Sequence, residues 1–552
     1  MLERITGGRY YLAALGGFLL TLAFPKFDVA GLAWVAPGLI LFSASGQKAA
    51  KCFRIGYIAG LVHFLTALYW ILLIPFPGGA IAGWLALSAF CALYFGAWSW
   101  LSWKIFPGTT FVASAHTGTD STNQTAQDFF GLNWLQRTVW AIACAMIWVA
   151  MEMLRARLLG GFPWIPVGAS QHKILPVIQL ASVTGVYGIS FLTVWFAVSL
   201  SWAAFALAQK SAAYRSGMKE IILPLLVVLI VGGWGYDRLR RPATVRGQLK
   251  VALVQPSIKQ EMIFDLRESP ARFSKLMELS QHALAIRPDI LIWPEASMPD
   301  FSEANFVAIT NLIASNHVWM VFGADDVEVE PIGSSAATTN FFNGAFLFGP
   351  DGRYVERYHK RRLVMFGEFI PLANQLPFLR QLIPLGDFTP GDRVLQFTLS
   401  QPTVAMAPLI CFEDVFPHDA REHLEDDTDF FLNLTNDGWF RQSAAHWQQL
   451  ATAIFRAVEN GVVLVRCTNN GITCWVDECG RVLQIFHDDA GNAYGVGFLS
   501  GEIPLPDHSK RRATIFRRHG DWFGWGCVFL TGATLAVSAF PRRKSRLATP
   551  LL

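Results

Sequence analysis

The sequence has little charge for its length. Only 16% of its 552 residues are Asp, Glu, Lys or Arg, whereas 53% are hydrophobic and 20 are tryptophan. A chain of this length and composition is too apolar to form one soluble domain. The formal net charge is only +4, and no stripe of basic residues is present. The sequence therefore gives no indication of nucleic-acid binding.

Several common catalytic and metal-binding signatures are also missing. The chain has no G-x-S-x-G, H-E-x-x-H or Walker sequence, which removes three frequent enzyme classes from consideration. Its eight cysteines include no C-x-x-C pair, so we predict no metal site and no cofactor. Cys474 and Cys479 flank a short turn, and a disulfide between them in an oxidising compartment is left open.

Long apolar runs are present in two parts of the chain. Runs that approach or reach the length of a membrane span occur at residues 11–24, 32–45, 55–74, 81–106, 139–158, 183–207, 221–234 and 522–540. Between them lie about 280 residues of mixed polarity, a size that suits one globular domain.

We therefore predict a polytopic α-helical membrane domain with eight transmembrane helices plus an external α/β domain. Seven helices fall within residues 1–236 and the eighth at 520–540. The external domain covers 247–505, and a basic tail covers 541–552. Because the first apolar run lacks a small-residue cleavage site, we interpret it as an anchor and not as a removed signal peptide.

Lys and Arg in the short loops predict the orientation of the helices. With eight helices, four basic groups fall on one side: Arg4 and Arg9; Lys48, Lys51 and Arg54; Lys210, Arg215 and Lys219; Arg542, Arg543, Lys544 and Arg546. We expect that side to be cytoplasmic, together with the polar stretch 107–137, and the α/β domain to lie on the other side. Arg155, Arg157 and Lys173 are exceptions to the rule.

An acidic residue inside a predicted membrane helix is a candidate functional group. Glu152 is such a residue, but Arg155 follows it by three positions. We therefore favour a structural ion pair on one helix face.

The external domain alternates strand-length apolar runs with helical patterns. The runs lie at residues 249–255, 289–295, 318–323, 344–349, 403–411, 429–435 and 462–468, and the clearest helical patterns lie at 271–286 and 445–460. This alternation predicts an α/β domain whose sheet is covered by helices.

Three reactive side chains lie at or near strand ends, where the chemistry of such domains usually sits. Glu295 ends the run 289–295, Lys360 lies in RYHKRRLVMFGEFIP, and Cys411 ends the run 403–411. Glu413 and Asp414 follow the cysteine closely, and such carboxylates disfavour a thiolate. A reactive Cys411 therefore needs a base and a compensating cation.

These residues carry a resemblance to a known family. The order Glu, Lys, Cys within WPE, Y-x-K-x-x-L-V-x-F-G-E-x-I-P and ICFED resembles the carbon–nitrogen hydrolase (nitrilase) superfamily. The stretches GFPWIPVGASQ at 161–171, IQLASVTGVYGISF at 178–191 and GLVHFLTALYWI at 60–71 are similar to the apolipoprotein N-acyltransferases. The resemblance implies a nitrilase-like αββα sandwich for the external domain, in a multi-pass protein of the bacterial inner membrane with its catalytic domain facing the periplasm.

The resemblance also implies an activity and its substrates. The family moves an acyl chain from a membrane phospholipid onto the α-amine of the diacylglyceryl-cysteine of an apolipoprotein. By motif, Cys411 is expected to be the nucleophile that forms a thioester, Glu295 the general base and Lys360 the cation at the oxyanion. The reaction is then a ping-pong transfer.

Further positions are assigned by the same resemblance. Glu368 and Glu413 are expected to keep Lys360 charged and in place, and the backbone N–H of Phe412 to bind the oxyanion. Trp439 and Phe440, with Asn343 and Asn436, are expected at the substrate and lipid entrance.

Two other functions remain open from the residues. A membrane-tethered nitrilase-like amidase would use the same triad with water as the second nucleophile. A catalytically silent protein would use the domain to bind lipids or partners, although the intact triad argues against this.

Overall fold

A computed structural model of the chain describes residues 5–107, 129–208, 218–242, 244–298, 301–332, 336–371, 375 and 388–539. Most of the polar stretch predicted at 107–137 lies outside the described residues. The same is true of the basic tail at 541–552 and of Arg4, Lys210 and Arg215. What the sequence predicts for these parts stays a prediction.

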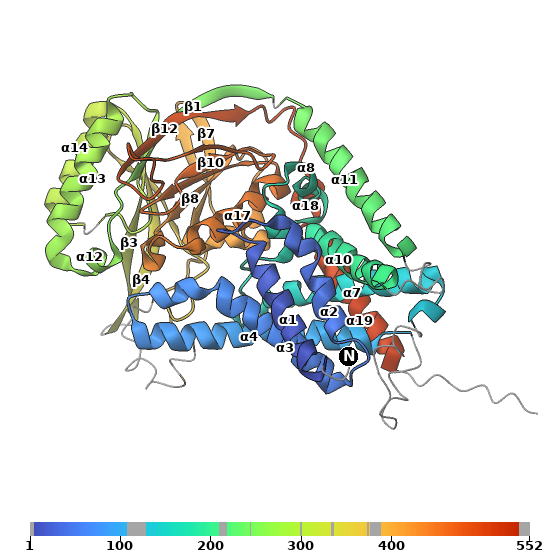
Figure 1. The fold of residues 1–552 in the computed structure, drawn as a ribbon. Helices are drawn as coiled ribbons and strands as arrows, with labels where there is room; N and C mark the ends of the chain where they lie inside the picture. Colours follow the sequence, from blue (N-terminus) through green and yellow to red (C-terminus); the bar gives the residue numbers. More distant parts are fainter. Residues whose placement is uncertain are drawn as a thin grey trace, which may run out of the picture.

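Apolar helices form one side of the molecule (Figure 1). They are α1 (Ile5–Leu22), α2 (Ala36–Ser43), α3 (Ala49–Ala67), α4 (Pro77–Lys104), α7 (Trp134–Arg155), α10 (Val186–Ala208), α11 (Ile222–Arg240) and α19 (Trp522–Ala539). Each predicted membrane segment thus contains a helix, but four of the described helices are both long and apolar enough to cross a membrane: Gly78–Lys104, Trp134–Arg155, Val186–Ala208 and Met218–Arg240. The segment at 32–45 breaks into a 3₁₀ turn (Ala30–Trp34) and the short α2. The count of eight transmembrane helices stays a prediction.

Small residues let these helices pack closely. A Cβ atom on Gly17 of α1 would lie 2.1 Å from the carbonyl oxygen of Ala59 on α3. Only glycine permits this approach, which is typical of helix contacts in membranes.

The other side of the molecule contains two six-stranded sheets. The first has the order β12 (Gly497–Pro506), β1 (Val245–Gln255), β2 (Ile290–Ile292), β3 (Trp319–Ile332), β4 (Ala336–Phe348), β5 (Tyr354–His359). The second has the order β11 (Val482–Ile485), β10 (Cys474–Val476), β9 (Val463–Thr468), β8 (Phe430–Thr435), β7 (Thr403–Ile410), β6 (Phe397–Ser400). The central strands β1–β2–β3 and β7–β8–β9 are parallel.

The two sheets and the helices on their outer faces form four layers, as predicted for an αββα sandwich. One apolar cluster fills the space between the sheets, with side chains such as Leu253 and Val321 from the first and Leu432 and Val465 from the second. Helices α13 (Ser269–Leu284) and α14 (Glu303–Asn316) cover the outer face of the first sheet (Figure 1). Helix α17 (Ala444–Asn460) lies between the second sheet and the apolar helices.

Gln448 of α17 ties the sandwich to the apolar helices. Its Oε1 accepts hydrogen bonds from the indole N–H groups of Trp70 (3.0 Å) and Trp164 (2.9 Å). Its Nε2 donates to the carbonyl oxygens of Pro25 (3.2 Å) and Ala67 (3.1 Å). One buried amide thus uses its hydrogen-bonding capacity to fix the two parts of the chain against each other.

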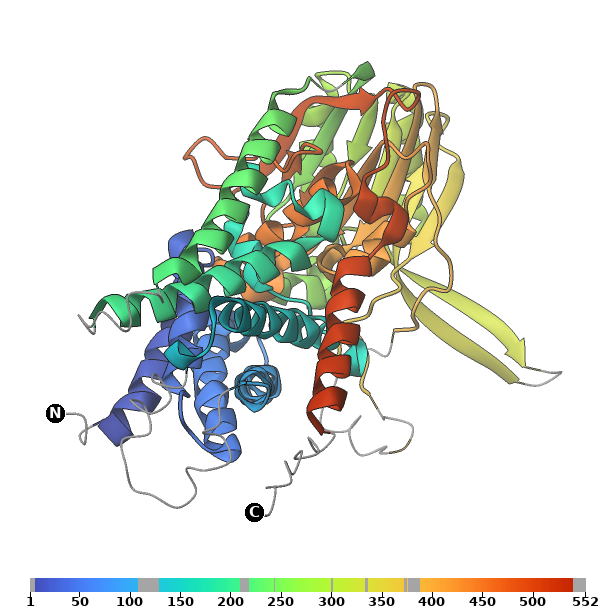
Figure 2. The same ribbon diagram turned by 90° about the vertical axis from the view of Figure 1, so that its right-hand side faces the viewer.

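The first and last helices have their outer ends on the same side of the molecule. The start of α1 and the end of α19 both point away from the sheets (Figure 2). The orientation predicted from the basic residues stays a prediction. The side of the membrane itself stays a prediction.

The disulfide left open between Cys474 and Cys479 is not formed, because both cysteines are free thiols. Cys474 lies in β10 within the apolar core. Cys479 lies in the following turn, where its carbonyl oxygen accepts a hydrogen bond from Gln179 Nε2 (2.8 Å). Burial raises the pKa of both thiols, to about 12 for Cys474 and about 11 for Cys479.

Candidate active site

The fold brings Glu295, Lys360 and Glu368 into direct contact. Glu295 follows β2 and Lys360 follows β5, 65 residues later in the sequence. The Lys360 Nζ lies 3.2 Å from Glu295 Oε1 and 2.8 Å from Glu368 Oε1. The lysine is only 1% exposed and Glu295 7% exposed. A buried ammonium is thus paired with two carboxylates, as its burial requires.

Cys411 occupies a sharp turn between β7 and a 3₁₀ turn, Cys411–Val415. Its φ angle is +52°, a conformation that non-glycine residues adopt rarely and that concentrates at functional sites. Its carbonyl oxygen accepts hydrogen bonds from Asn433 Nδ2 (3.0 Å) and Gln449 Nε2 (3.1 Å). Two buried amides therefore hold the backbone of the proposed nucleophile.

The charges of the site act on one another. Burial and the Glu295 carboxylate raise the pKa of Cys411 well above its usual value, although Lys360 opposes this shift. Burial, with Glu368, also raises the pKa of Glu295. Burial alone would lower the pKa of Lys360, but Glu295 and Glu368 outweigh it and hold the pKa well above its usual value. The resting site therefore contains a thiol and an ammonium, so the thiol proton must be removed as the sulfur attacks.

Asn343 and Asn436 belong to this hydrogen-bond network. Asn343 Nδ2 donates to Glu295 Oε1 (2.7 Å) and to Glu368 Oε1 (2.9 Å). The backbone N–H of Asn436 donates to the other oxygen of Glu295 (2.8 Å). Both asparagines were expected at the substrate and lipid entrance. In the structure they contact the carboxylates of the site, and their role at the entrance stays a prediction.

Glu413 binds backbone N–H groups with both of its carboxylate oxygens. One of its oxygens accepts hydrogen bonds from the backbone N–H groups of Arg361 (2.7 Å) and Arg362 (3.1 Å), and the other from that of Ile410 (2.7 Å). The Tyr358 hydroxyl donates to the same carboxylate. These donors flank Lys360 and Cys411 in the sequence. Glu413 therefore holds together the two chain segments that carry these residues. Its predicted effect on the charge of Lys360 stays a prediction.

Aromatic rings connect Cys411 to the apolar helices. The ring of Phe412 stacks on Trp164 (centroids 6.1 Å apart), Trp164 contacts Trp70 (5.2 Å), and Trp70 contacts Phe440 (4.6 Å). Trp439, expected beside Phe440 at the entrance, is half-buried. Trp70 and Trp164 were not predicted as site residues, although both lie in stretches that carry the resemblance to the family.

Comparisons with known proteins decide the family. Residues 16–199 match the apolipoprotein N-acyltransferase N-terminal domain, and residues 250–498 match carbon-nitrogen hydrolase. An apolipoprotein N-acyltransferase of Geobacter metallireducens is 31% identical over 549 residues, which cover 97% of this chain and 96% of that protein. The chain belongs to the apolipoprotein N-acyltransferase family.

A second relative agrees with this result. An apolipoprotein N-acyltransferase of Vibrio parahaemolyticus is 29% identical over 92% of this chain and 93% of its own length. Among solved structures, an amidase from Nesterenkonia sp. has 18% identity and a TM-score of 0.34, covering 49% of this chain and 95% of the amidase. Membership of the N-acyltransferase family makes the chain an acyltransferase with a carbon–nitrogen hydrolase domain, which confirms the predicted family and enzyme class.

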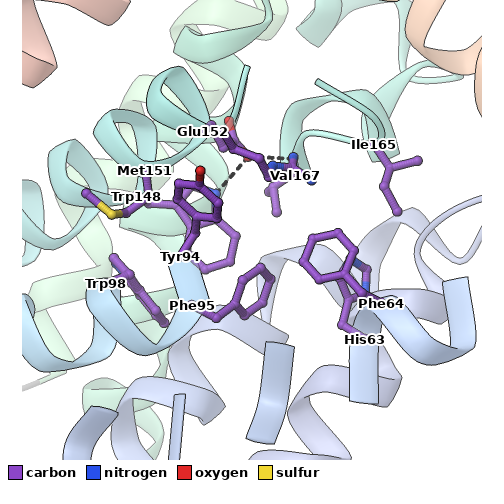
Figure 3. A pocket seen from close by; sticks show the side chains of 11 residues that line it. His63, Phe64, Tyr94, Phe95, Trp98, Trp148, Met151, Glu152, Ile165 and Val167 are labelled. Atoms are coloured by element: carbon purple, nitrogen blue, oxygen red, sulfur yellow. Dashed lines mark hydrogen bonds between the residues drawn. The ribbon is translucent and has the colours of Figure 1, made fainter. Parts of the chain in front are cut away.

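The helical part of this N-acyltransferase family member contains a pocket near Glu152 (Figure 3). The Glu152 Oε1 accepts hydrogen bonds from the Trp148 indole (2.8 Å) and from the backbone N–H of Val167 (2.8 Å). Among the described residues, Arg155 and Glu152 form no ion pair within 4.0 Å; Arg155 instead lies over the Phe64 ring at 5.3 Å. The predicted i, i+3 pair is therefore wrong, because Glu152 anchors the loop that begins at Val167.

One group of metal-ligand side chains occurs in the described part of the chain. Ligand atoms of Asp326, Glu328 and His359 lie within 4.8 Å of one another. The Arg357 guanidinium donates to both carboxylates. A cation of the protein thus already balances this group.

Proposed function

We propose that the chain transfers an acyl chain from a membrane phospholipid to the α-amine of diacylglyceryl-cysteine in apolipoproteins, through a thioester on Cys411. The observation that carries the proposal is the set of contacts among Glu295, Lys360 and Glu368 next to a strained Cys411, with aromatic rings leading from Cys411 to the apolar helices. The family's name gives the acceptor class.

In the first half-reaction, the Cys411 sulfur attacks the ester carbonyl of the phospholipid while Glu295 takes the thiol proton. Negative charge develops on the carbonyl oxygen. Lys360 and the backbone N–H of Phe412, which lies in the first turn of a 3₁₀ helix and lacks an intrahelical partner there, stabilise this charge. The C–O bond then breaks, Glu295 returns the proton to the leaving lysophospholipid, and a thioester remains on Cys411.

In the second half-reaction, the free amine of the lipoprotein attacks the thioester. Glu295 accepts a proton from the nitrogen as the C–N bond forms, and the C–S bond breaks. That proton finally rests on the Cys411 sulfur. If the amine arrives as an ammonium, its additional proton leaves to solvent. The products are the amide and the original thiol.

The helices serve this reaction by bringing the site to its substrates. Removing an acyl chain from the bilayer costs about 0.8 kcal/mol per CH₂ group, so both lipid substrates remain in the membrane. In the proposed arrangement, eight helices anchor the protein in the bacterial inner membrane with the sandwich on the periplasmic side. The contacts of Gln448 then hold the catalytic domain at the membrane surface.

Two-substrate kinetics test the proposal. The enzyme is incubated with a phospholipid that carries a labelled acyl chain and with a synthetic diacylated lipopeptide, and both products are quantified. Lysophospholipid and triacylated lipopeptide are expected in equal amounts, with the parallel double-reciprocal lines of a ping-pong reaction. An N-acetylated lipopeptide is the control acceptor. Turnover of small amides without consumption of phospholipid would favour the tethered amidase instead.

A further inference from the structure

Asp325 of β3 lies on the face of the sheet that contacts Glu295. A Cβ atom built on Gly323 would lie 2.6 Å from the Cα of Glu295, so this face of β3 is against the proposed base. Asp325 follows by two residues in the same strand, and residues two apart in a strand share a face. The β3–β4 ladder pairs Asp325 directly with Asn343. Cross-strand partners of this kind have Cβ atoms about 4.5–5.5 Å apart.

Asn343 presents an unused acceptor at this place. Its Nδ2 is occupied by Glu295 and Glu368, which fixes the orientation of the amide. Its Oδ1 is buried and has no hydrogen-bond partner among the described residues, and the residue as a whole is only 6% exposed. A buried acceptor without a donor is costly, so a ligand that donates a hydrogen bond there is favoured.

The local charge favours a cation. Asp325 is exposed at the surface, and within the described part of the chain it has no ion-pair partner closer than 4.0 Å. The Lys360 ammonium of the site is already held by Glu295 and Glu368. Partial loss of water around the Asp325 carboxyl and the negative charges of Glu295 and Glu368 raise its pKa to about 6, and Arg272 opposes this shift. A positive group bound here would relieve this repulsion.

The next pair of residues on the same face is apolar. Val327 and Phe341 face each other across the ladder, and they are 51% and 48% exposed. Figure 2 shows the ends of β3 and β4 projecting beyond the rest of the sheet. The place that would bind an ammonium thus lies next to an exposed apolar surface. This combination fits a molecule that carries alkyl chains close to an amine.

We propose that Asp325 and the Oδ1 of Asn343 bind the primary ammonium of a lipidated substrate, namely the N-terminal α-ammonium of the acceptor. This inference rests on the proposed function. An α-amino group has a pKa of about 7.7–8.0, so near neutral pH it reaches the site mainly as an ammonium. Asp325 binds the ammonium beside Glu295, and the amine then loses a proton and attacks the thioester. A phosphoethanolamine head group on the acyl donor carries the same kind of primary ammonium. The experiment below distinguishes binding of this head group from binding of the acceptor.

The test compares Asp325→Asn with Asp351→Asn in the full-length enzyme. Asp351 is an exposed carboxylate in the turn after β4, so this control removes the same charge away from the site. Three rates are measured by mass spectrometry: acylation of Cys411 by phosphatidylethanolamine and by phosphatidylglycerol, discharge of the thioester by a diacylated lipopeptide with a free amine, and discharge by hydroxylamine, which is uncharged at neutral pH.

In Asp325→Asn, we expect the KM for the lipopeptide to rise about 3- to 5-fold, which corresponds to the upper end of the contribution of an exposed charge pair. The kcat, both acylation rates and hydroxylamine discharge are expected to stay within about twofold of wild type. Asp351→Asn is expected to resemble wild type in every measurement.

Three results would overturn the inference. Equal slowing of lipopeptide and hydroxylamine discharge would mean that Asp325 shapes the site and does not bind the ammonium. Slower acylation by phosphatidylethanolamine alone would assign the residue to the donor head group. Unchanged rates in all arms would leave the residue without this role. A wild-type enzyme that never acylates Cys411 would instead refute the proposed function, and the inference would fall with it.

Discussion

Replacing Glu413 by glutamine removes one hydrogen-bond acceptor from the centre of the catalytic domain. The carboxylate accepts backbone N–H groups on both of its oxygens, from Arg361 and Arg362 on one and from Ile410 on the other. Glutamine can keep its oxygen toward Arg361 and Arg362, but its NH₂ group then faces the Ile410 N–H. Two donors cannot bond to each other.

The expected cost follows from this mismatch. A hydrogen bond to a charged acceptor contributes about 1.5–3 kcal/mol, and a buried donor left without an acceptor costs about 1–3 kcal/mol. We therefore expect Glu413→Gln to destabilise the domain by roughly 2–5 kcal/mol. Because Ile410 directly precedes Cys411, the nucleophile is displaced as well. A displacement of about 1 Å can cost about 100-fold in rate, and we expect a loss of that order in Cys411 acylation.

The assay follows the acyl adduct on Cys411 by mass spectrometry at several times after phospholipid is added, together with the thermal unfolding midpoint in detergent. The matched control is Glu422→Gln. Glu422 is an exposed glutamate whose carboxylate lies 3.2 Å from the Arg361 guanidinium, and exposed pairs contribute about 0–1 kcal/mol. Wild-type stability and acylation in Glu413→Gln would refute the positioning role. Wild-type stability with a shifted pH dependence of Cys411 alkylation would instead favour the predicted effect of Glu413 on the charge of Lys360.

Two further predictions concern charge and packing. Lys360 lowers the pKa of Cys411, whereas Glu295 raises it. Lys360→Met is therefore expected to move the pH profile of Cys411 alkylation by iodoacetamide to higher pH, and Glu295→Gln to move it to lower pH. Shifts in the opposite directions would contradict the charge arrangement. Gln448→Leu loses four buried hydrogen bonds, at about 0.5–1.5 kcal/mol each, and is expected to lower the thermal unfolding midpoint. The control Gln442→Leu changes an exposed position and is expected to leave the midpoint unchanged. Equal midpoints in the two variants would show that the Gln448 amide does not join the two parts of the chain.

The sequence predicted the central strands well and the edge strands poorly. The runs at 249–255, 403–411 and 429–435 became β1, β7 and β8, because fully buried strands are continuous apolar stretches. Strands at the sheet edges were not predicted. β11 is almost entirely exposed, and β5 has a single buried residue, so neither has an apolar run to detect.

The same limit applied to the site. Glu295, Lys360 and Cys411 were predicted as site residues because each lies in a short motif at or near a strand end. The contacts of Glu413 with Arg361 and Arg362 join positions about 50 residues apart, and no local pattern encodes them. The contacts of the Asn343 amide with Glu295 and Glu368 were likewise not predicted, because they depend on the β3–β4 register.

The central claim is a covalent acyl-enzyme on Cys411, and its most direct test is peptide mass spectrometry of the purified protein after incubation with a defined phospholipid. We expect an acyl adduct on Cys411 that hydroxylamine removes, that a diacylated lipopeptide with a free N-terminal amine discharges, and that Cys411→Ala lacks. A correctly folded enzyme that turns over small amides but never carries an acyl group on Cys411 would contradict the claim and identify a hydrolase instead.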